Sequence, residues 1–65
     1  MSTMYVISNE TGKVVATITG PSSEGRNGNK RHEEAFETHY GSNDYSNSFT
    51  DFGLEYDEAV DELEV

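Results

Sequence analysis

The fold is decided by the stretch MYVISNETGKVVATIT, which spans residues 4–19. Its two ends, residues 4–8 and 13–19, are rich in the β-branched and aromatic side chains that favour strands. The segment between them closes with Gly12, which can adopt the positive φ of a tight turn without steric cost. The pattern therefore predicts an N-terminal β-hairpin.

Side chains alternate between the two faces of a strand, so the hairpin has two distinct surfaces. Tyr5 and Ile7 share one face of the first strand. Val14, Ala16 and Ile18 share one face of the second strand. We expect the first helix of the chain to cover one face of this hairpin.

A polar segment follows the hairpin. Pro21 ends the second strand, because proline has no N–H to donate to a neighbouring strand. Residues 20–29 are rich in Gly, Ser and Asn, which predicts a flexible loop. Three basic residues gather towards its far end: Arg26, Lys30 and Arg31. They fit either a solvated loop or a contact with a phosphate or an acidic partner.

A helix is predicted from Asn29, a favourable N-cap, through Tyr40, with Gly41 as its stop signal. Its apolar-leaning stripe recurs at helical spacing and consists of His32, Ala35, Phe36, His39 and Tyr40. The other side of the helix carries Glu33, Glu34 and Glu37. We expect the stripe, including its two histidines, to pack inward.

Residues 42–53 give a weaker pattern. Ser, Asn and Asp dominate the segment and favour turns, yet it also holds Tyr45, Phe49 and Phe52. A third strand and an irregular loop packed by its aromatic rings both fit these residues. We favour a short third strand around residues 46–52.

The C-terminal segment, from Gly53 to Val65, regains a regular pattern. An amphipathic helix is indicated by the i, i+3, i+4, i+7 spacing of Tyr56, Ala59, Val60 and Leu63. The remaining positions are almost wholly acidic. In an alternative arrangement, only one helical turn forms and residues 63–65 add to the edge of the hairpin. The favoured fold is α+β, a hairpin with two short helices, the C-terminal one strongly acidic.

The charges are divided unequally along the chain. Residues 1–32 hold all four Lys and Arg and two Glu, a net charge of +2, whereas residues 33–65 hold eleven carboxylates and no basic residue. The net charge of the whole chain is −9. A surface of one sign repels itself and weakens the compact state, so its presence favours a strongly basic partner; the alternatives are that the charge keeps a small protein in solution or binds cations. The same charge disfavours direct binding to nucleic acid or to anionic lipid.

The size and composition predict one small domain, residues 1–65, near the lower limit for a chain that folds alone. The chain has no Cys, which excludes a disulfide, a thiolate metal site and a catalytic thiol. No apolar run approaches the ~18 residues of a membrane span, and no signal-peptide pattern begins the chain. These features predict a cytoplasmic protein that acts inside a host cell.

Motifs of catalysis and metal binding are missing from the sequence. It contains no nucleophile elbow, phosphate-binding loop, dinucleotide fingerprint or HExxH. On a helix, His32 and His39 would lie two turns apart, about 10 Å, which is too far to bind one metal ion. A chain of this length also has little room for a water-excluding pocket around paired carboxylates. We therefore expect neither enzymatic activity nor a metal or other cofactor.

The predicted partner-binding surface consists of the carboxylates of the acidic half together with one tyrosine: Glu33, Glu34, Glu37, Asp44, Asp51, Glu55, Tyr56, Asp57, Glu58, Asp61, Glu62 and Glu64. On a C-terminal helix, Asp57, Asp61 and Glu64 would form one row and Glu58 and Glu62 a second row. The charge density of these rows would match that of duplex DNA, one charge per about 1.7 Å of axis, to within a factor of two. The expected partner is a basic nucleic-acid-binding protein.

The hairpin opening at residues 5–15 and the Lys- and Arg-free acidic half resemble the small, acidic, phage-type anti-CRISPR proteins and related DNA mimics. The resemblance implies a non-catalytic inhibitor that occupies the positively charged nucleic-acid channel of a CRISPR–Cas effector subunit. Specificity would then come from aromatic rings near the charges, with Tyr40, Tyr45 and Tyr56 as candidates. The alternative is a small regulatory or antitoxin-like interaction module that binds its partner through an apolar patch, without mimicry.

Overall fold

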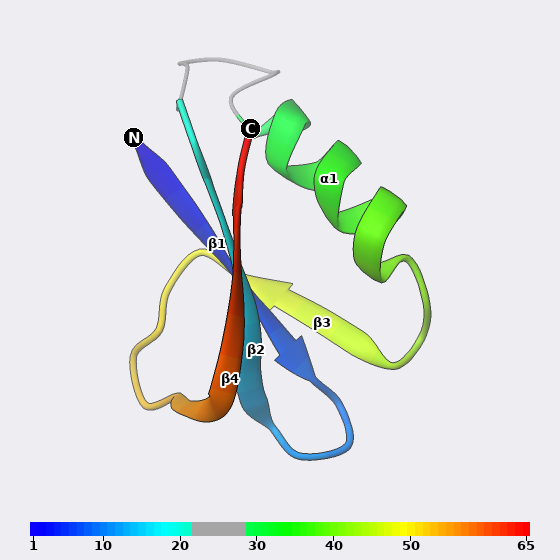
Figure 1. Ribbon diagram of the computed structural model, residues 1–65, viewed down its shortest axis with the longest axis vertical. Coiled ribbons are helices and arrows are strands. Elements are labelled where there is room, and N and C mark those ends of the chain that lie inside the picture. The colour runs from blue at the N-terminus through cyan, green and yellow to red at the C-terminus, as the bar shows by residue number, and fades with distance from the viewer. Residues whose placement is uncertain (22–28) are drawn as a thin grey trace.

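The computed structural model describes residues 1–21 and 29–65, which form one helix and a four-stranded sheet (Figure 1). The elements are β1 (Ser2–Ser8), β2 (Lys13–Gly20), α1 (Lys30–Tyr40), β3 (Tyr45–Ser48) and β4 (Glu55–Glu64). The strand order is β3-β1-β2-β4, so β3 and β4 are the two edges of the sheet.

The centre of the sheet is the predicted hairpin, in which β1 and β2 are antiparallel. Gly12 has a φ of 74°, and its N–H donates a hydrogen bond to the carbonyl of Ser8 over 2.7 Å. β1 also pairs antiparallel with β3, whereas β2 and β4 are parallel. The sheet is therefore mixed, with its one parallel pair at the β4 edge.

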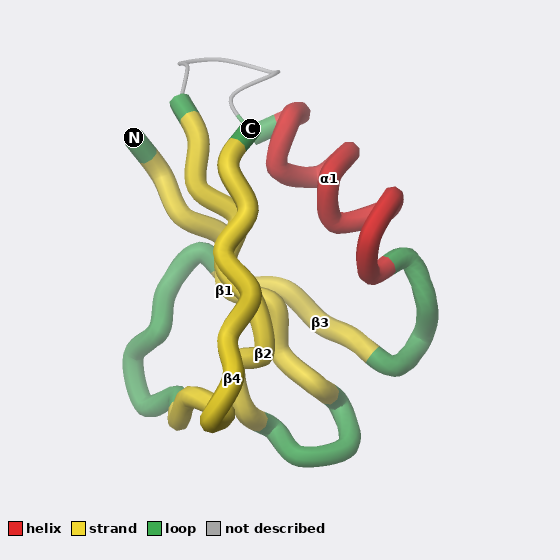
Figure 2. The backbone as a smooth tube through the Cα atoms, in the orientation of Figure 1, coloured by secondary structure: helices red, strands yellow, loops and turns green. Residues whose placement is uncertain are grey.

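The two faces of the sheet are covered differently. Figure 2 shows α1 on one side of the sheet and the connection between β3 and β4 on the other. The core lies under α1 and consists of Met4, Val6, Ala16, Ile18 and Phe36. These strand residues alternate along β1 and β2, so a single face of the hairpin supplies most of the buried side chains.

A β-bulge at Val15 divides the apolar residues of β2 between the two faces. Val14 lies opposite Ile7, and Val15 is the extra residue before Ala16. Val15 packs against the core under α1, whereas Val14 is fully buried outside that core. The prediction that Val14 shares a face with Ala16 is therefore wrong, because the bulge shifts the alternation by one residue.

The predicted first helix is present as α1, flanked by Asn29 and Gly41. Asn29 does not cap the helix with its side chain; its Oδ1 instead accepts a hydrogen bond from the Ser2 hydroxyl at 3.3 Å. His32 of the predicted stripe is buried, but His39 is exposed, so the stripe is narrower than expected. Most of the loop predicted before this helix, including Arg26, lies outside the described residues.

The expectation of a second, C-terminal helix is wrong, because residues 55–64 form a strand, β4. In a helix, carboxylates four residues apart would repel each other, and acidic residues in the last turn would oppose the helix dipole. In the strand, Leu63 lies opposite Ile18 and packs against the core. The Val65 N–H donates to the Thr19 carbonyl at 2.9 Å. Residues 63–65 therefore follow the alternative of addition to the edge of the hairpin.

The third strand exists but is shorter than residues 46–52. β3 ends at Ser48, after which side chains take over the hydrogen bonding of the backbone. The N–H of Thr50 donates to Ser48 Oγ at 3.1 Å, and the N–H of Phe52 donates to Thr50 Oγ1 at 3.3 Å. Such local side-chain acceptors favour turns over strand pairing.

Ile18 is fully buried, so truncating it tests the core under α1. We expect Ile18→Ala to lower the free energy of unfolding by about 2–5 kcal/mol, because it leaves a cavity beneath the helix. Urea denaturation of the full chain measures the change. Phe52→Ala is the control, since Phe52 is 93% exposed and its truncation should cost at most about 0.5 kcal/mol. Equal losses in the two variants would contradict this core.

Candidate partner-binding surface

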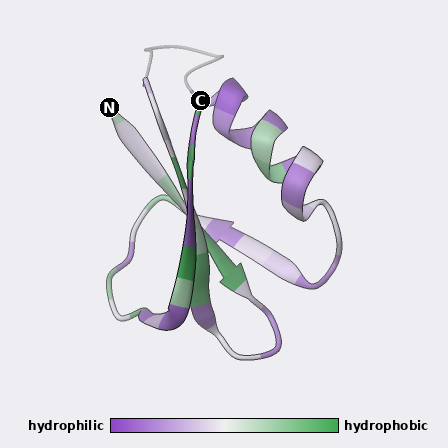
Figure 3. Cartoon of the chain, in the orientation of Figure 1, coloured by the Kyte–Doolittle hydropathy of each residue, from purple (hydrophilic) through white to green (hydrophobic). Residues whose placement is uncertain are grey.

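The carboxylates predicted to bind a partner do not form two rows on one helix. The structure places them on α1, on β4 and in the two segments beside β3. Glu33, Glu34 and Glu37 are on α1; Glu55, Asp57, Glu58, Asp61, Glu62 and Glu64 are on β4; Asp44 precedes β3 and Asp51 follows it. All eleven are exposed, and Figure 3 shows hydrophilic residues on both α1 and β4.

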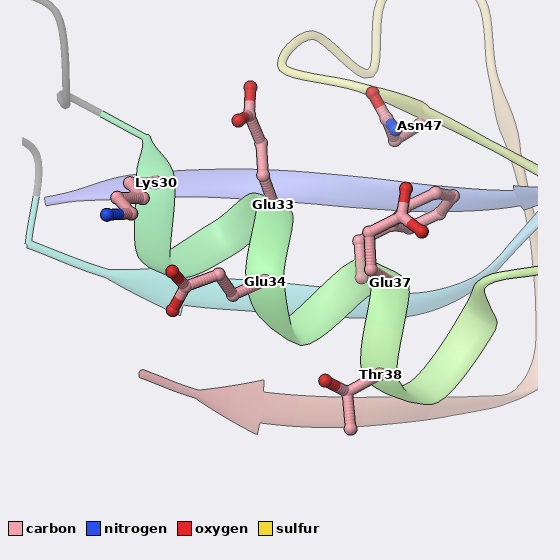
Figure 4. Close-up of a pocket in the computed structure, with 7 residues that line it drawn as sticks. Lys30, Glu33, Glu34, Glu37, Thr38 and Asn47 are labelled. Carbon is pink, nitrogen blue, oxygen red and sulfur yellow. The ribbon is translucent and has the colours of Figure 1, made fainter.

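The α1 carboxylates border a shallow hollow of about 640 Å³. It is also lined by Lys30, Phe36, Thr38 and Asn47. In Figure 4 the side chains of Glu33, Glu34 and Glu37 extend in different directions from the helix, and they do not converge on one point. This arrangement contributes charge to the surface without defining a pocket for a small ligand.

Asp44 belongs to a junction between the hairpin and the start of β3. Its carbonyl accepts a hydrogen bond from the N–H of Asn9 at 2.8 Å, and the Asn9 side-chain amide donates to the Asn43 carbonyl, also at 2.8 Å. Ser8, Glu10 and Tyr45 complete a second hollow of about 490 Å³ there. Asp44 is therefore separated from the β4 carboxylates by the width of the sheet.

β4 carries six acidic residues in ten and forms one edge of the sheet. It pairs with β2 in two parts: residues 55–56 lie opposite residues 13–14, and residues 61–64 lie opposite residues 16–19. Between these parts the register shifts: the four residues 57–60 of β4 correspond to the single residue Val15 of β2, so regular pairing is interrupted there. The regular part of the acidic edge is therefore the segment 61–64.

The side chains of this segment alternate between the two faces of the sheet. Asp61 and Leu63 pair with the core residues Ala16 and Ile18, so they lie on the face covered by α1. The Asp61 carboxylate is close to Tyr40, whose pKa is raised first by burial and then by that negative charge. Glu62 and Glu64 lie on the opposite face, beside the threonines of β2.

Tyr56 is 47% exposed, but its polar and aromatic groups already have partners within the chain. Its hydroxyl donates a hydrogen bond to Asp51 Oδ2 at 2.8 Å, which is the main cause that raises its pKa to about 12. Its ring meets that of Tyr5 edge-on, with 6.3 Å between centroids. Tyr56 therefore connects the segment after β3 to Tyr5, on the face of the sheet opposite α1.

The other two aromatic candidates for specificity pack inside the domain. The rings of Tyr40 and Tyr45 are 5.1 Å apart and edge-on, and both side chains pack against the core. Phe52 was not predicted as a site residue, yet it is 93% exposed. It sits in a turn in which the Leu54 N–H donates to the Asp51 carbonyl at 3.0 Å. The sequence signal for this position was a Phe between two turn-forming residues, Asp and Gly.

His32 has a structural position between α1 and β1. Its Nε2 lies 3.0 Å from the Ser2 carbonyl, and its ring meets that of Phe49 edge-on at 5.8 Å. Its Nδ1 is buried without a hydrogen-bond partner among the described residues. Because a carbonyl oxygen only accepts, Nε2 is the donor of this hydrogen bond, which ties the start of α1 to β1.

Within residues 1–21 and 29–65, no group of three or more His, Cys, Asp or Glu side chains is arranged to hold a metal ion. In the same described residues, no helix is long and apolar enough to cross a membrane. No protein-family model matches the chain, and neither a curated protein nor a solved structure matches it.

The exposed carboxylates predict that salt stabilises the fold. Monovalent salt screens repulsion among like charges, and a gain of about 0.5 kcal/mol would raise Tm by roughly 2–4 °C in a domain of this size. We expect Glu62→Gln/Glu64→Gln to raise Tm at low salt and to flatten its salt dependence. Glu33→Gln is the contrast, because Glu33 lies in the first turn of α1, where the helix dipole favours a carboxylate. A Tm of the parent protein that falls steadily with added salt would contradict the repulsion.

Because of its hydrogen bond to Asp51, Tyr56 should lose its proton at a higher pH than an ordinary tyrosine. Its folded-state pKa of about 12 exceeds the ordinary value of 10.0, so its stabilising effect is complete below pH 10 and is lost as the pH rises through 12. Asp51→Ala should return this pKa towards 10.0. Tyrosinate absorbance measures the titration, and Tyr56→Phe assigns the step. Identical titrations of the parent and Asp51→Ala would show that the hydrogen bond does not form.

Proposed function

We propose that the protein is a non-catalytic inhibitor that binds a basic nucleic-acid-binding protein and blocks the access of nucleic acid. The target class implied by the resemblance of the sequence is a CRISPR–Cas effector subunit. The observation that carries the proposal is the edge strand β4, six of whose ten residues are exposed carboxylates.

The spacing of these charges supports mimicry of a phosphate backbone. Residues of a strand rise by about 3.3 Å each, so Asp61, on the face covered by α1, and Glu62 and Glu64, on the opposite face, together place three carboxylates within roughly 10 Å along β4. One strand of duplex DNA carries a charge every 3.4 Å or so of helix axis, which is a comparable density. Lys and Arg side chains that bind phosphates can form charge-assisted hydrogen bonds with these carboxylates.

Long-range electrostatics supports the same function. The net charge of −9 repels nucleic acid and attracts a groove lined with Lys and Arg. Such attraction raises the rate of association with a basic groove more than it selects one basic protein over another. An inhibitor of this kind therefore needs a second, uncharged contact for specificity.

Phe52 supplies an aromatic side chain for that contact. It is 93% exposed, and a hydrogen-bonded turn holds it beside Asp51, close to the start of β4. Buried aromatic anchors commonly dominate the binding energy of protein interfaces. The same observation favours the second candidate function, a small regulatory module whose interface is mainly apolar. The two functions differ in the salt dependence of binding, which is steep for mimicry and slight for an apolar interface.

A competition titration tests the proposal. Purified CRISPR effector complexes of different types are each bound to labelled target nucleic acid, and the protein is added at two salt concentrations. We expect saturable displacement from at least one effector, with an affinity that falls steeply as salt rises. No displacement from any effector would overturn the proposed target class, and simultaneous binding of both ligands to one effector would overturn mimicry.

Two charge-matched variants locate the inhibitory surface. Asp61→Asn/Glu62→Gln/Glu64→Gln removes three carboxylates from β4, and the loss of each charge-assisted hydrogen bond should cost about 1–3 kcal/mol where the pair is desolvated. Glu33→Gln/Glu34→Gln/Glu37→Gln removes the same charge from α1 and should inhibit nearly as well as the parent. The opposite ranking would assign the inhibitory surface to α1.

A further inference from the structure

We propose that the outer edge of β4 binds an extended basic segment of the partner, which joins the sheet as an additional strand antiparallel to residues 61–64. The inference rests on the proposed function for the class of partner. It adds the chemistry that the partner must present: backbone groups in a strand, with a basic, an apolar and a basic side chain in succession.

The backbone of β4 supplies the first argument. The Val65 N–H donates to the Thr19 carbonyl of β2 at 2.9 Å. Successive residues of a strand direct their N–H and C=O groups to alternate sides, so Leu63 also faces β2, whereas Glu62 and Glu64 face outward. In the described residues, no strand lies beyond β4. These outward N–H and C=O groups form an open template for one more strand.

The side chains supply the second argument. In an antiparallel pair, residues directly opposite each other place their side chains on the same face. The residues opposite Glu62 and Glu64 would therefore lie beside these two carboxylates, and Lys or Arg there forms favourable pairs. The residue between them would lie opposite Leu63, which is half-buried and packs against the core. An apolar side chain fits that position.

The charge of β4 favours a basic partner over a second copy of this chain. Two β4 strands paired edge to edge would place carboxylates against carboxylates, which is destabilising. β3, the other edge, has only four residues, none of them charged. The bulge at residues 57–60 limits regular pairing on β4 to the segment 61–64. The added strand is therefore short, and a peptide representing it should bind weakly and sensitively to salt.

The test uses a blocked synthetic peptide, acetyl-Val-Lys-Val-Lys-Val-amide, titrated into the isotope-labelled full chain at low salt and followed by NMR. We expect the amides of Glu62 and Glu64 to shift and to exchange with solvent more slowly. The amide of Val65 should change little, because it already donates to Thr19. Absence of exchange protection at Glu62 and Glu64 in the peptide complex would overturn the inference.

Two N-methylated peptides separate strand pairing from simple charge attraction. Methylation at both lysines removes the N–H groups that face β4, whereas methylation at two valines removes N–H groups that face away. The charge is the same in both peptides. We expect the first to lose binding and the second to keep it. Equal binding of the two would show that only charge holds the peptide.

Charge-matched variants of the protein complete the test. Glu62→Gln/Glu64→Gln should weaken peptide binding roughly 2- to 30-fold, the sum expected for two cross-strand charge pairs. Glu33→Gln/Glu34→Gln on α1 should leave it nearly unchanged, and an equal loss in both variants would overturn the inference. No effector is present, so the outcome is independent of inhibition. If the peptide binds but the protein does not displace nucleic acid from an effector, only the proposed function is overturned. If the protein displaces nucleic acid but the peptide does not pair with β4, only the inference is overturned.

Discussion

The contact between α1 and one face of the β1–β2 hairpin holds this domain together. Phe36 of α1 closes a core to which the strands contribute Met4, Val6, Ala16 and Ile18. With so few buried side chains, each has a large effect on a marginal net stability. The outer strands are held largely by backbone pairing and by half-buried residues such as Leu63. The six acidic side chains of β4 are all exposed and none belongs to the core, so they are present at little cost to the packing under α1.

The same acidic edge has two physical consequences that support each other. An unpaired edge strand invites association with other strands, and charged side chains are a common protection against it. Here the charges all have one sign, so the protection acts against further copies of this chain and not against a basic segment. Repulsion among the carboxylates lowers stability in the free protein. A basic partner of the proposed kind would relieve that repulsion on binding, so the cost in the free state would favour the proposed complex.

Local signals predicted the hairpin and α1, because turn residues and helix ends are encoded within a few positions. β4 depends on pairing with β2, which lies some forty residues earlier in the chain. The helical spacing of Tyr56, Val60 and Leu63 was misleading, because the three side chains do not share one face. Tyr56 contacts Tyr5 on the face opposite α1, whereas Leu63 packs against the core under α1. Val60 lies in the irregular part of β4. The acidic last turn argued against a helix from the sequence alone. The sequence predicted which residues give the candidate surface its charge, but it did not predict their arrangement. That arrangement depends on residues 55–64 forming a strand and not a helix.

The turn that presents Phe52 and the acidic edge are parts of one continuous segment, and a single hydrogen bond connects them. The Tyr56 hydroxyl, at the start of β4, donates to the carboxylate of Asp51, at the start of that turn. Tyr5 supports the Tyr56 ring from the central strand β1. The turn that carries Phe52 is thus held against the start of β4 within the free protein. Such preorganisation reduces the entropy lost on binding. In the proposed complex, Tyr56 would therefore contribute by positioning this turn, because its own hydroxyl is already bonded to Asp51.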